Sequence, residues 1–304
     1  MRLFFWRKQP PQPTQLEAPR RWTWLGGRRV LTDTPYVMPK DSAEGDRLEA
    51  QHHLFKLAAG GLYRAPLRQP RAILDVACGT GIWAREMALK FPRAQVIGID
   101  IDPSLPERAI EILGPSGQFP QNFRFQVADV LQPLPFEDGA FYFVHARLIS
   151  PFVPIKAWPQ VVREMARVLK RGGLIEVVDG EQVPQSPSTS FRQLFQFPQT
   201  LLEKRGLHVA MGDALMDYFR QAGIQRIQQR KFTLGRGRGA SETARQQRLL
   251  AADLLAAMAN FKPLAVQQYG ISAEDFDRLC QQAKEEVPRL GIHWPVVFCF
   301  GTKL

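Results

Sequence analysis

The sequence predicts an α/β fold built around a parallel sheet. Short apolar runs alternate with amphipathic runs between residues 71 and 180, and this alternation is typical of strands joined by crossover helices. The chain has 304 residues, of which 45% are hydrophobic and 10% aromatic. This composition provides a sizeable core and excludes wholesale disorder, and the length suits one large domain with accessory segments.

Residues 71–180 are expected to form the parallel part of the sheet. Their apolar runs fit buried strands, and the amphipathic runs between them fit crossover helices. Ligands of such sheets lie beyond the carboxyl ends of the strands, so the candidate site residues follow each strand. The predicted strands are Ala72–Ala77, Gln95–Asp100, Phe123–Ala128, Phe141–Ala146 and Leu174–Val178, and the predicted helices are Ile82–Lys90, Pro106–Leu113 and Lys156–Leu169.

The part after residue 180 is expected to complete the sheet and to add a helical insertion at about residues 236–292. This stretch is far longer than the turn that two neighbouring strands need. Its apolar helix face fits packing on the sheet, a cap over a site, an apolar substrate or a dimer surface. The predicted elements are helices Ser190–Lys204 and Asp213–Gln221, strand Ile224–Leu234, helices Glu242–Asn260 and Ser272–Glu286, and strand Trp294–Gly301.

Two segments precede the sheet. Residues 1–20 are rich in Pro and Gln and carry basic residues, which predicts a flexible arm. Residues 21–70 form an entry segment whose clearest element is a helix that begins at Asp41, with Glu44 as a reciprocal capping partner. The expected division is therefore an arm, an entry segment and a sheet domain over residues 71–304.

The chain is strongly basic. Forty Lys and Arg against 29 Asp and Glu give a formal charge of +11 and a pI near 9.9. The excess lies in residues 1–30, with +6, and in residues 220–250, with +7. Clustered positive charge attracts anionic partners such as nucleic acid or a membrane surface, but it also suits a solvated surface, and both interpretations stay open.

Composition argues against a membrane-spanning, disulfide-bonded or metal-binding protein. No uncharged apolar run approaches the 18 or so residues that span a bilayer. Cys78, Cys280 and Cys299 are scattered and form no Cys/His cluster, so neither a disulfide framework nor a metal site is expected. The sequence predicts a cytoplasmic protein with a small-molecule partner, and the basic segments keep nucleic acid as a less favoured partner that is not excluded. A homo-oligomer through the N-terminal segment or the insertion is a further option.

The candidate chemistry begins after the first strand. A turn of small residues from Ala77 to Gly81 opens a helix, and Gly79 and Gly81 let the backbone pass close to a ligand. At the end of the second strand, Asp100 is placed to accept both hydroxyls of a ribose. Residues 79–84 also satisfy the dinucleotide pattern G-x-G-x-x-A, so an NAD site has to be compared with other nucleotide sites.

Three further features favour a different adenosine-containing ligand. Asp75 lies four residues before the first glycine, where a pyrophosphate turn has no use for it but a ligand with an ammonium and a sulfonium does. Asp129 follows the third strand and is placed to accept from the amine of an adenine. Gly172 and Gly173 then turn the chain into the fifth strand. The combination is more specific than any one of these signals.

With these motifs in this order, residues 70–180 resemble the class I S-adenosylmethionine-dependent methyltransferases. The resemblance implies a Rossmann-like, seven-stranded sheet whose last strand is antiparallel, and S-adenosylmethionine as the cofactor. Ala77 stands where the family more often has glycine. The resemblance also implies that Asp75, Ala77, Gly79 and Gly81 line the methionine half of the cofactor, Asp100 holds the ribose, and Ile101, Asp129 and Val130 surround the adenine.

A narrower resemblance lies upstream. It implies that the entry segment closes over the pocket, which makes Tyr36 a cofactor contact and makes Glu44 and His52 candidates for cofactor or substrate contact. His52 equally fits a half-buried position in its helix, and His53 fits the surface. The residues similar to the entry segment of the LaeA-like group, which includes bacterial natural-product methyltransferases, are Gly27–Arg29, Tyr36–Pro39, Asp41, Glu44, Arg47, His52 and His53.

Methyl transfer from a sulfonium needs in-line positioning and exclusion of water, with a base only when the acceptor must lose a proton. His145 at the end of the fourth strand is the candidate base, because imidazole titrates near neutral pH; a structural bond to a loop is the alternative. His52 is the second catalytic candidate. Arg147 is a candidate partner for the cofactor carboxylate or an acidic acceptor, and a loop ion pair is its alternative.

Absent motifs narrow the acceptor. The fourth strand lacks an Asn/Asp-Pro-Pro-Tyr turn and the chain lacks a Pro-Cys pair, which argues against the common DNA and protein-glutamine amino-methylating enzymes and against cytosine-carbon enzymes. The expected function is methyl transfer to O, N or C of a small, apolar or aromatic, natural-product-like molecule. The alternatives are a regulatory or protein-binding module that retains the cofactor fold, an NAD-linked oxidoreductase, and nucleic-acid methylation directed by the basic segments.

Overall fold

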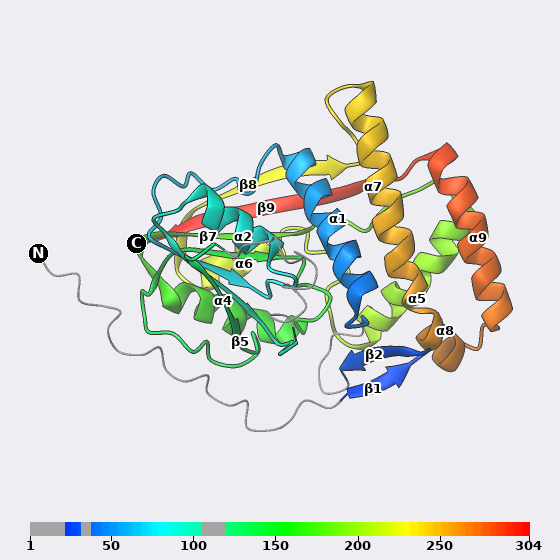
Figure 1. The fold of residues 1–304 in the computed structure, drawn as a ribbon, viewed down its shortest axis with the longest axis horizontal. Helices are drawn as coiled ribbons and strands as arrows, with labels where there is room; N and C mark the ends of the chain where they lie inside the picture. Colours follow the sequence, from blue (N-terminus) through cyan, green and yellow to red (C-terminus); the bar gives the residue numbers. More distant parts are fainter. Residues whose placement is uncertain (1–21, 32–37, 105–119) are drawn as a thin grey trace, which may run out of the picture.

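The computed structural model describes residues 22–31, 38–104 and 120–304, and the structural statements below refer to them. Tyr36, the arm at residues 1–20 and the predicted helix Pro106–Leu113 lie outside the described residues. Elements carry the labels of Figure 1.

The elements up to the middle of the sheet are β1 (Trp22–Leu25), β2 (Arg28–Leu31), α1 (Ser42–Ala59), β3 (Ala72–Val76), α2 (Ile82–Lys90), β4 (Gln95–Asp100), β5 (Phe123–Val127) and β6 (Phe141–Arg147). From α1 to the middle of the sheet, the described elements follow the prediction closely, whereas the two short strands before α1 were not predicted. The remaining elements are η1 (Ile155–Ala157), α4 (Trp158–Val168), β7 (Leu169–Gly180), α5 (Thr189–Lys204), α6 (Ala214–Gln221), β8 (Ile224–Leu234), α7 (Ala240–Ala259), α8 (Lys262–Tyr269), α9 (Ala273–Leu290) and β9 (Trp294–Lys303).

Seven strands form one mixed sheet in the order β5-β4-β3-β6-β7-β9-β8. Neighbours from β5 to β7 pair in parallel, and β9 lies antiparallel between β7 and β8. The predicted fold class is confirmed, including the antiparallel last strand. Strand order reverses between β3 and β6, which is where doubly wound sheets bind their ligands.

Helices cover both faces of the sheet (Figure 1). On one face, α4 and α6 bury Trp158 and Phe219 in the largest apolar cluster of the described residues. On the other face, α2 buries Trp83 and Met87. Burying apolar area on both faces stabilises a parallel sheet and explains why its strands read as nearly continuous apolar runs.

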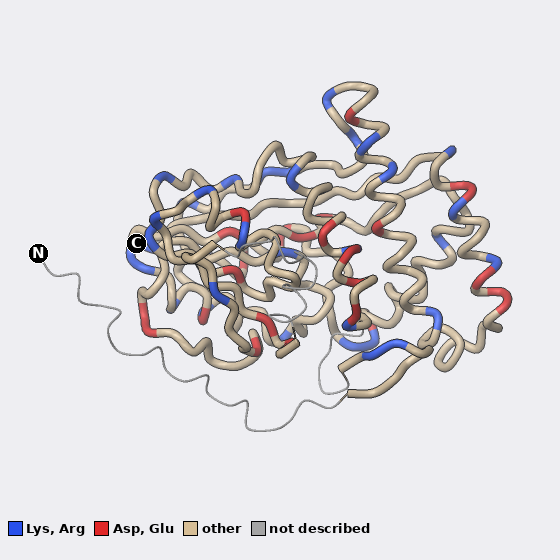
Figure 2. Tube along the Cα trace, in the orientation of Figure 1, with Lys and Arg blue, Asp and Glu red and all other residues tan. Residues whose placement is uncertain are grey.

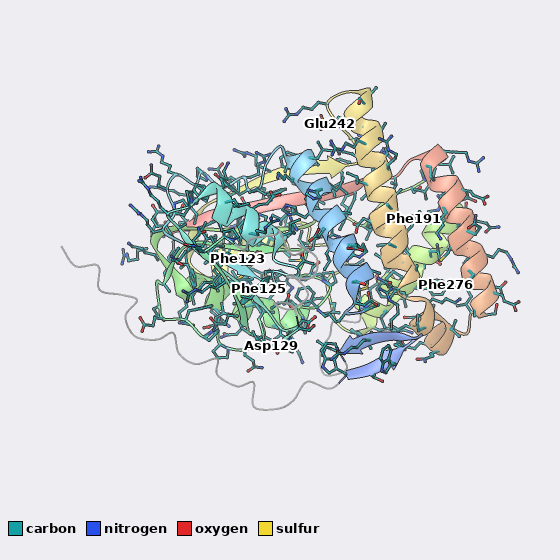
Figure 3. All side chains as sticks on the ribbon, viewed as in Figure 1. Phe123, Phe125, Asp129, Phe191, Glu242 and Phe276 are labelled. Atoms are coloured by element: carbon teal, nitrogen blue, oxygen red, sulfur yellow. The ribbon has the colours of Figure 1, made fainter. Side chains whose placement is uncertain are left out.

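A second, helical part lies beside the sheet. Figure 1 shows α5, α7, α8 and α9 together at one side, with α1 between them and α2. Phe191 of α5 and Phe276 of α9 belong to the core of this part, whereas Phe123 and Phe125 belong to the sheet (Figure 3). The insertion thus contains the two predicted helices and one further short helix, α8, and it builds a core continuous with α1.

The ends of α1 show which local signals were interpreted correctly. Asp41 caps the helix by accepting the backbone N–H of Glu44 at 3.0 Å, and Gly60 ends it in the left-handed conformation with φ of 67°. The reciprocal bond from the Glu44 side chain to the Asp41 N–H stays a prediction. The Glu44 carboxylate also pairs with Arg47 at 2.6 Å.

The fifth strand begins earlier than predicted. β7 starts at Leu169 rather than Leu174, and its register to β6 shifts between Phe141 and Phe143. Residues 170–173 form the resulting bulge, in which Gly172 has φ of 76°. A Cβ on Gly173 would lie 2.8 Å from the carbonyl oxygen of Lys170, so the Gly-Gly pair is needed by a bulge inside the strand and not by a turn before it.

Glu176 on β7 is fully buried in the sheet. Its Oε2 accepts the backbone N–H groups of Arg64 and Ala65 at 2.7 and 2.6 Å, while Oε1 has no hydrogen-bond partner. Burial raises the pKa of Glu176 to about 7. The side chain fixes the segment after α1 to the sheet at the cost of a buried charge at neutral pH.

Replacing Glu176 by Gln is expected to stabilise the protein increasingly as the pH rises. A carboxyl with a raised pKa binds more protons in the folded than in the unfolded state. The stability of the wild type therefore falls as the pH rises from the ordinary glutamate pKa of about 4.3 to the folded value. The free energy of unfolding of the variant minus that of the wild type should grow by up to about 1.4 kcal/mol per pH unit in this range. Urea denaturation at pH 5, 6 and 7 measures it; a constant difference contradicts the expectation.

Basic residues of the second stretch lie along β8 and on the loop before α7 (Figure 2). β8 is an edge strand, and its exposed residues include Arg226, Arg230 and Lys231. In the described ranges, no single helix has the length and apolar character needed to cross a membrane; α7 and α8 pass that test only jointly, with a 45° bend between them.

Candidate active site

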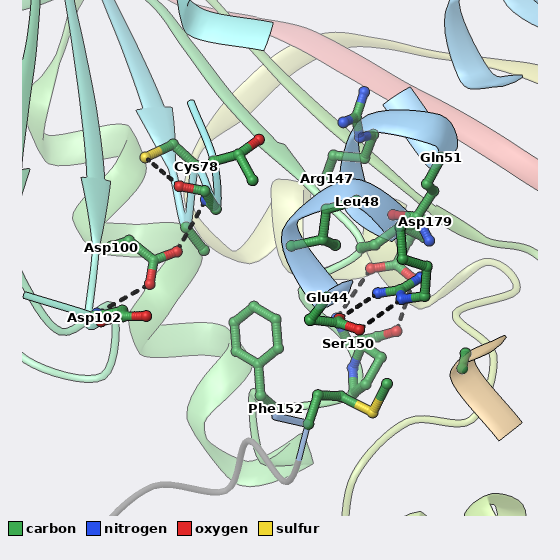
Figure 4. A pocket seen from close by; sticks show the side chains of 18 of the residues that line it. Glu44, Leu48, Gln51, Cys78, Asp100, Asp102, Arg147, Ser150, Phe152 and Asp179 are labelled. Atoms are coloured by element: carbon green, nitrogen blue, oxygen red, sulfur yellow. Dashed lines mark hydrogen bonds and ion pairs between the residues drawn. The ribbon is translucent and has the colours of Figure 1, made fainter. Parts of the chain in front are cut away.

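A cavity of about 310 Å³ lies at the carboxyl ends of β3, β4 and β6, at the point where strand order reverses. In Figure 4, Asp100 and Asp102 lie at one side of it, and Glu44, Arg147 and Asp179 lie at the other. Residues of α1, α5 and α7 complete its wall. The cavity therefore spans the sheet edge and the helical part.

The turn after β3 is held in left-handed backbone conformations. Ala77, Gly79 and Gly81 have φ of 55°, 56° and 76°. Ala77 and Gly79 line the cavity, and a Cβ on Gly79 would lie 3.6 Å from Leu48 of α1. Gly81, which the resemblance placed beside the cofactor, is not among the residues of the cavity wall. It precedes α2, and a Cβ there would collide with the ring of Phe125.

Replacing Ala77 by glycine is expected to raise the free energy of unfolding by about 1 kcal/mol. Alanine at positive φ is strained, whereas glycine adopts this conformation without a Cβ penalty. The gain from relieved strain exceeds the entropy that glycine adds to the unfolded chain. Chemical denaturation measures it, with Ala72→Gly in the regular part of β3 as the control that should lose stability. Loss of stability in both variants contradicts the strain.

Asp100 ends β4 with its carboxylate in the cavity wall. Its Oδ2 accepts the N–H of Gly79 at 3.0 Å, and its Oδ1 accepts the N–H of Asp102 at 3.1 Å. Lys40 Nζ lies 4.0 Å from Oδ1. Because each carboxylate oxygen can accept more than one hydrogen bond, both oxygens can still accept from neighbouring hydroxyls of a ribose.

Asp129 and Val130 line the cavity after β5, and Ile101 lines it after β4. Asp129 Oδ1 accepts the N–H of Leu131 at 2.9 Å, which holds the carboxylate in a tight turn. Since β4 and β5 are neighbours in the sheet, the structure brings Asp100, Ile101, Asp129 and Val130 to one end of the cavity.

His145 and Asp75 form a buried pair at the floor of the site. They are register partners on β6 and β3, and His145 Nδ1 lies 2.9 Å from Asp75 Oδ1. The carboxylate favours the tautomer with the proton on Nδ1, so Nε2 keeps a lone pair. The imidazole stacks on Trp83 with 3.7 Å between ring centroids. Burial lowers the pKa of His145 against the opposing effect of Asp75, which favours the neutral form.

Arg147 ends β6 and lines the cavity. Its guanidinium lies 3.2 Å from Nδ1 of His52 and 5.4 Å from the ring centroid of Phe55. None of the carboxylates in the described ranges forms an ion pair with it, and burial lowers the pKa of Arg147. Arg147 is half-buried, and a poorly solvated cation without an anion in contact is unfavourable, so this guanidinium is suited to a negatively charged ligand.

His52 is fully buried on α1 and lines a separate hollow of about 10 Å³ instead of the main cavity. The structure thus favours the alternative to direct substrate contact, and His53 is exposed, as predicted. His52, His53 and Glu86 form the one group in the described part of the chain with metal-ligand types in reach of one another. Because Arg147 can only donate to Nδ1 of His52, Nε2 carries the proton and has no lone pair for a metal.

A buried polar cluster joins α1 to α7 at the cavity wall. Arg47 pairs with Glu44 at 2.6 Å and with Asp253 at 2.5 Å. Gln51 donates to Asp253 at 3.1 Å, and Asn260 donates to Glu44 at 3.0 Å. Sequence reasoning missed Gln51 and Asp253 as residues of the site. The available signal was a lone carboxylate on the apolar face of the insertion helix.

Apart from Asp253 and Ser150, the wall formed by α5, α7, the residue Phe261 after α7 and the loop after β6 is apolar. Asp179, at the end of β7, adds a further carboxyl that sequence reasoning also missed. Its Oδ1 accepts from Ser150 Oγ at 2.7 Å and its Oδ2 from the Ser150 N–H at 3.0 Å, and burial raises its pKa to about 6. The apolar side chains of this wall include Leu148, Phe152, Phe195, Leu254, Met258 and Phe261.

Comparisons with known proteins agree with this geometry. Residues 73–173 match a family model described as a methyltransferase domain. The secondary metabolism regulator LAE1 of Cochliobolus heterostrophus is 34% identical over 58% of this chain and 54% of its own length. Methyltransferase pytC of Aspergillus terreus is 30% identical over 71% of this chain and 66% of its own. The chain therefore spans about half to two thirds of the length of these relatives.

Solved structures share the fold. A chain of the complex between the Haloferax volcanii Trm112 methyltransferase activator and a methyltransferase superposes with a TM-score of 0.50 at 15% identity, and the match covers 86% of this chain and 95% of that one. This likeness concerns the architecture alone.

The sheet order, the acidic residues at the ends of β4 and β5 and the matching family model define a methyltransferase domain of the class I, S-adenosylmethionine-dependent kind. Within that class, the chain is similar to the LaeA-like group, to which the relative from Cochliobolus heterostrophus belongs.

The cavity fits the cofactor of this class, S-adenosylmethionine, on three counts. Asp100 has acceptor capacity left for a ribose diol. The turn at Ala77 and Gly79 presents only backbone and a methyl group to the cavity. The guanidinium of Arg147 lacks an anion that the amino-acid carboxylate would supply. The acceptor Asp100 therefore matches the ribose end of S-adenosylmethionine, and the donor Arg147 matches its carboxylate end.

Proposed function

We propose that the chain binds S-adenosylmethionine and transfers a methyl group to O, N or C of a small, apolar or aromatic, natural-product-like molecule. The observation that carries this proposal is one cavity whose wall is acidic beside β4 and β5 and apolar beneath α5 and α7. Its volume of about 310 Å³ suits a small-molecule site, and walls from the helical part favour a small acceptor over a nucleic-acid duplex.

Different residues around the cavity bind different parts of the cofactor. Asp100 holds the ribose hydroxyls, and Asp129 and Val130 bind the adenine with Ile101 packed beside them. Ala77 and Gly79 give the methionine part a close approach to the backbone, and Asp75 attracts its ammonium. Support for these roles comes from the shared cavity wall and from the hydrogen bonds that fix both carboxylates.

Methyl transfer depends on positioning of the acceptor more than on reactive side chains. S-adenosylmethionine supplies a methyl group already activated by a sulfonium. The apolar wall excludes water and fixes the acceptor in line. Where the acceptor must lose a proton, His145 accepts it at Nε2, because Asp75 holds the proton on Nδ1 and burial favours neutral imidazole.

Thermal unfolding in parallel with S-adenosylmethionine, S-adenosylhomocysteine and NAD tests the cofactor. A ligand at about a hundred times its dissociation constant adds about 2.7 kcal/mol to the free energy of unfolding. We expect both adenosyl ligands to raise the midpoint and NAD to leave it unchanged. Stabilisation by NAD alone would reverse the assignment.

Transfer of a labelled methyl group to a panel of apolar and aromatic alcohols, amines and phenols tests the reaction. We expect incorporation into at least one class of acceptor, and none into duplex DNA. A second candidate, a regulatory module that keeps the cofactor, is favoured by the likeness to a protein named a secondary metabolism regulator. It predicts S-adenosylhomocysteine binding without transfer to any small acceptor.

A further inference from the structure

The contact between His52 of α1 and Arg147 at the end of β6 has a defined donor and acceptor. Arg147 has only donors, so in its 3.2 Å contact with His52 the imidazole Nδ1 must accept. The proton of His52 then lies on Nε2, which is 3.5 Å from Glu86 Oε2 and has no hydrogen-bond partner of ordinary length. Glu86 is itself anchored by Lys56 at 2.6 Å. The row Glu86, His52, Arg147 thus runs from the surface to the cavity wall.

The surroundings of His52 keep it an acceptor. The side chain is fully buried, and burial lowers the pKa of His52 to about 4, so the ring stays neutral beside the guanidinium. Phe55, one turn further along α1, covers the guanidinium with its ring at 5.4 Å. Two residues of the same helix therefore contact the Arg147 guanidinium, while its remaining donors are left for the cavity that Arg147 lines.

We propose that His52 is a positioning residue for cofactor binding: through Nδ1 it aims the Arg147 guanidinium at the carboxylate of S-adenosylmethionine. This inference rests on the proposed function, because it takes the cofactor as the ligand of the cavity. It replaces a catalytic role for His52, since the ring lies behind Arg147 in a separate hollow and does not line the main cavity. It also explains why a polar side chain occupies a buried position on α1.

Two ligands separate the carboxylate from the rest of the cofactor. S-adenosylhomocysteine carries the carboxylate, whereas 5′-methylthioadenosine has the same adenosine and thioether but lacks the whole amino-acid end, carboxylate and ammonium together. The Arg147 and His52 variants then assign the difference to the carboxylate, because a guanidinium binds the anion and not the ammonium. We expect Arg147→Met to weaken the binding of S-adenosylhomocysteine by about 10- to 100-fold, as for a lost hydrogen bond between charged groups. The affinity for 5′-methylthioadenosine should stay within about twofold of the wild-type value. Isothermal titration measures both.

His52→Asn and His52→Leu form the decisive pair, because the two side chains have nearly the same shape and only asparagine offers an acceptor at the δ position. We expect His52→Leu to weaken the binding of S-adenosylhomocysteine by about tenfold and His52→Asn to weaken it by no more than about threefold. The affinity for 5′-methylthioadenosine should be unchanged in both variants. A packing role predicts the reverse order, since leucine suits a buried site better. His53→Asn and His53→Leu, on the exposed neighbour, are matched controls without effect.

A double variant tests whether His52 acts through Arg147. If His52 acts through Arg147, adding His52→Leu to Arg147→Met should cause no further loss of S-adenosylhomocysteine affinity. Equal losses in the two His52 variants, parallel losses of both ligands, or additive losses in the double variant would overturn the proposal. If His52→Leu does not fold, the asparagine variant and Arg147→Met still decide it: strong loss in the former or none in the latter overturns it. Wild-type protein that binds neither ligand would instead refute the proposed function.

Discussion

Replacing Asp100 by alanine should weaken binding of S-adenosylhomocysteine by at least about 100-fold. The substitution removes the acceptor for both ribose hydroxyls, and hydrogen bonds to a charged group contribute about 1.5–3 kcal/mol each. It also releases the N–H groups of Gly79 and Asp102, which Asp100 holds at 3.0 and 3.1 Å. The turn that carries Ala77 and Gly79 therefore loses its anchor together with the ribose site.

Titration calorimetry with Asp100→Ala and Asp100→Asn measures this effect. Asparagine keeps one acceptor oxygen, so its loss should be intermediate, about tenfold. Asp217→Ala is the matched control, because that carboxylate is exposed on α6 and pairs only with Arg220 among the interactions of the described residues. Unchanged affinity in Asp100→Ala would mean that the adenosine ligand does not use the end of β4.

Replacing Arg47 by methionine should lower the free energy of unfolding by about 3–5 kcal/mol. Arg47 neutralises two buried carboxylates, Glu44 at 2% exposure and Asp253 at 2% exposure. Breaking a buried ion pair from one side leaves uncompensated charge, which is the costly case. Urea denaturation measures the loss, and the double variant Arg47→Met/Asp253→Asn should recover part of it.

The loss of unfolding free energy in Arg47→Met should depend on pH. Burial already raises the pKa of Asp253 against the lowering effect of Arg47, and removing the guanidinium raises it further. A carboxyl whose folded pKa is raised lowers stability as the pH rises from its unfolded value toward the folded one. The deficit should therefore be larger at pH 7 than at pH 4.5. A deficit that shrinks toward pH 7, or no recovery in the double variant, contradicts this account.

Much of the sheet could be predicted because its signals are local. Each strand from β3 to β6 is an apolar run with its own flanking turn, and the predicted bounds of β4, α2 and β8 coincide with those observed. Asp100, Asp129 and His145 were predicted for the same reason: each lies at or just after the carboxyl end of a strand, and the parallel topology brings these strand ends together.

The wall opposite the sheet could not be predicted in this way. Arg47 and Asp253 lie 206 residues apart, and their meeting depends on how the insertion packs against α1, for which no local pattern exists. His52 shows the same limit. Its helical spacing placed it on the buried face of α1, but only the fold shows that it meets Arg147 rather than a substrate.

Short elements escaped for a different reason. The hairpin of β1 and β2 has strands of only four residues around Gly26 and Gly27, and α8 has only eight residues. Neither is long enough for its periodicity to be distinguished from loop composition. A glycine pair between two runs with aromatic and aliphatic residues was the signal that could have indicated the hairpin.

The position of β9 governs how the protein is completed during synthesis. β8 pairs with β9 and with no other described strand, yet β9 begins about 60 residues later, after α7, α8 and α9. At about 5–20 residues per second, a ribosome needs roughly 3 to 12 s to supply that partner. Meanwhile β8 is a nascent strand without a neighbour, and Arg230 and Lys231 provide the charge that keeps such strands from joining other chains.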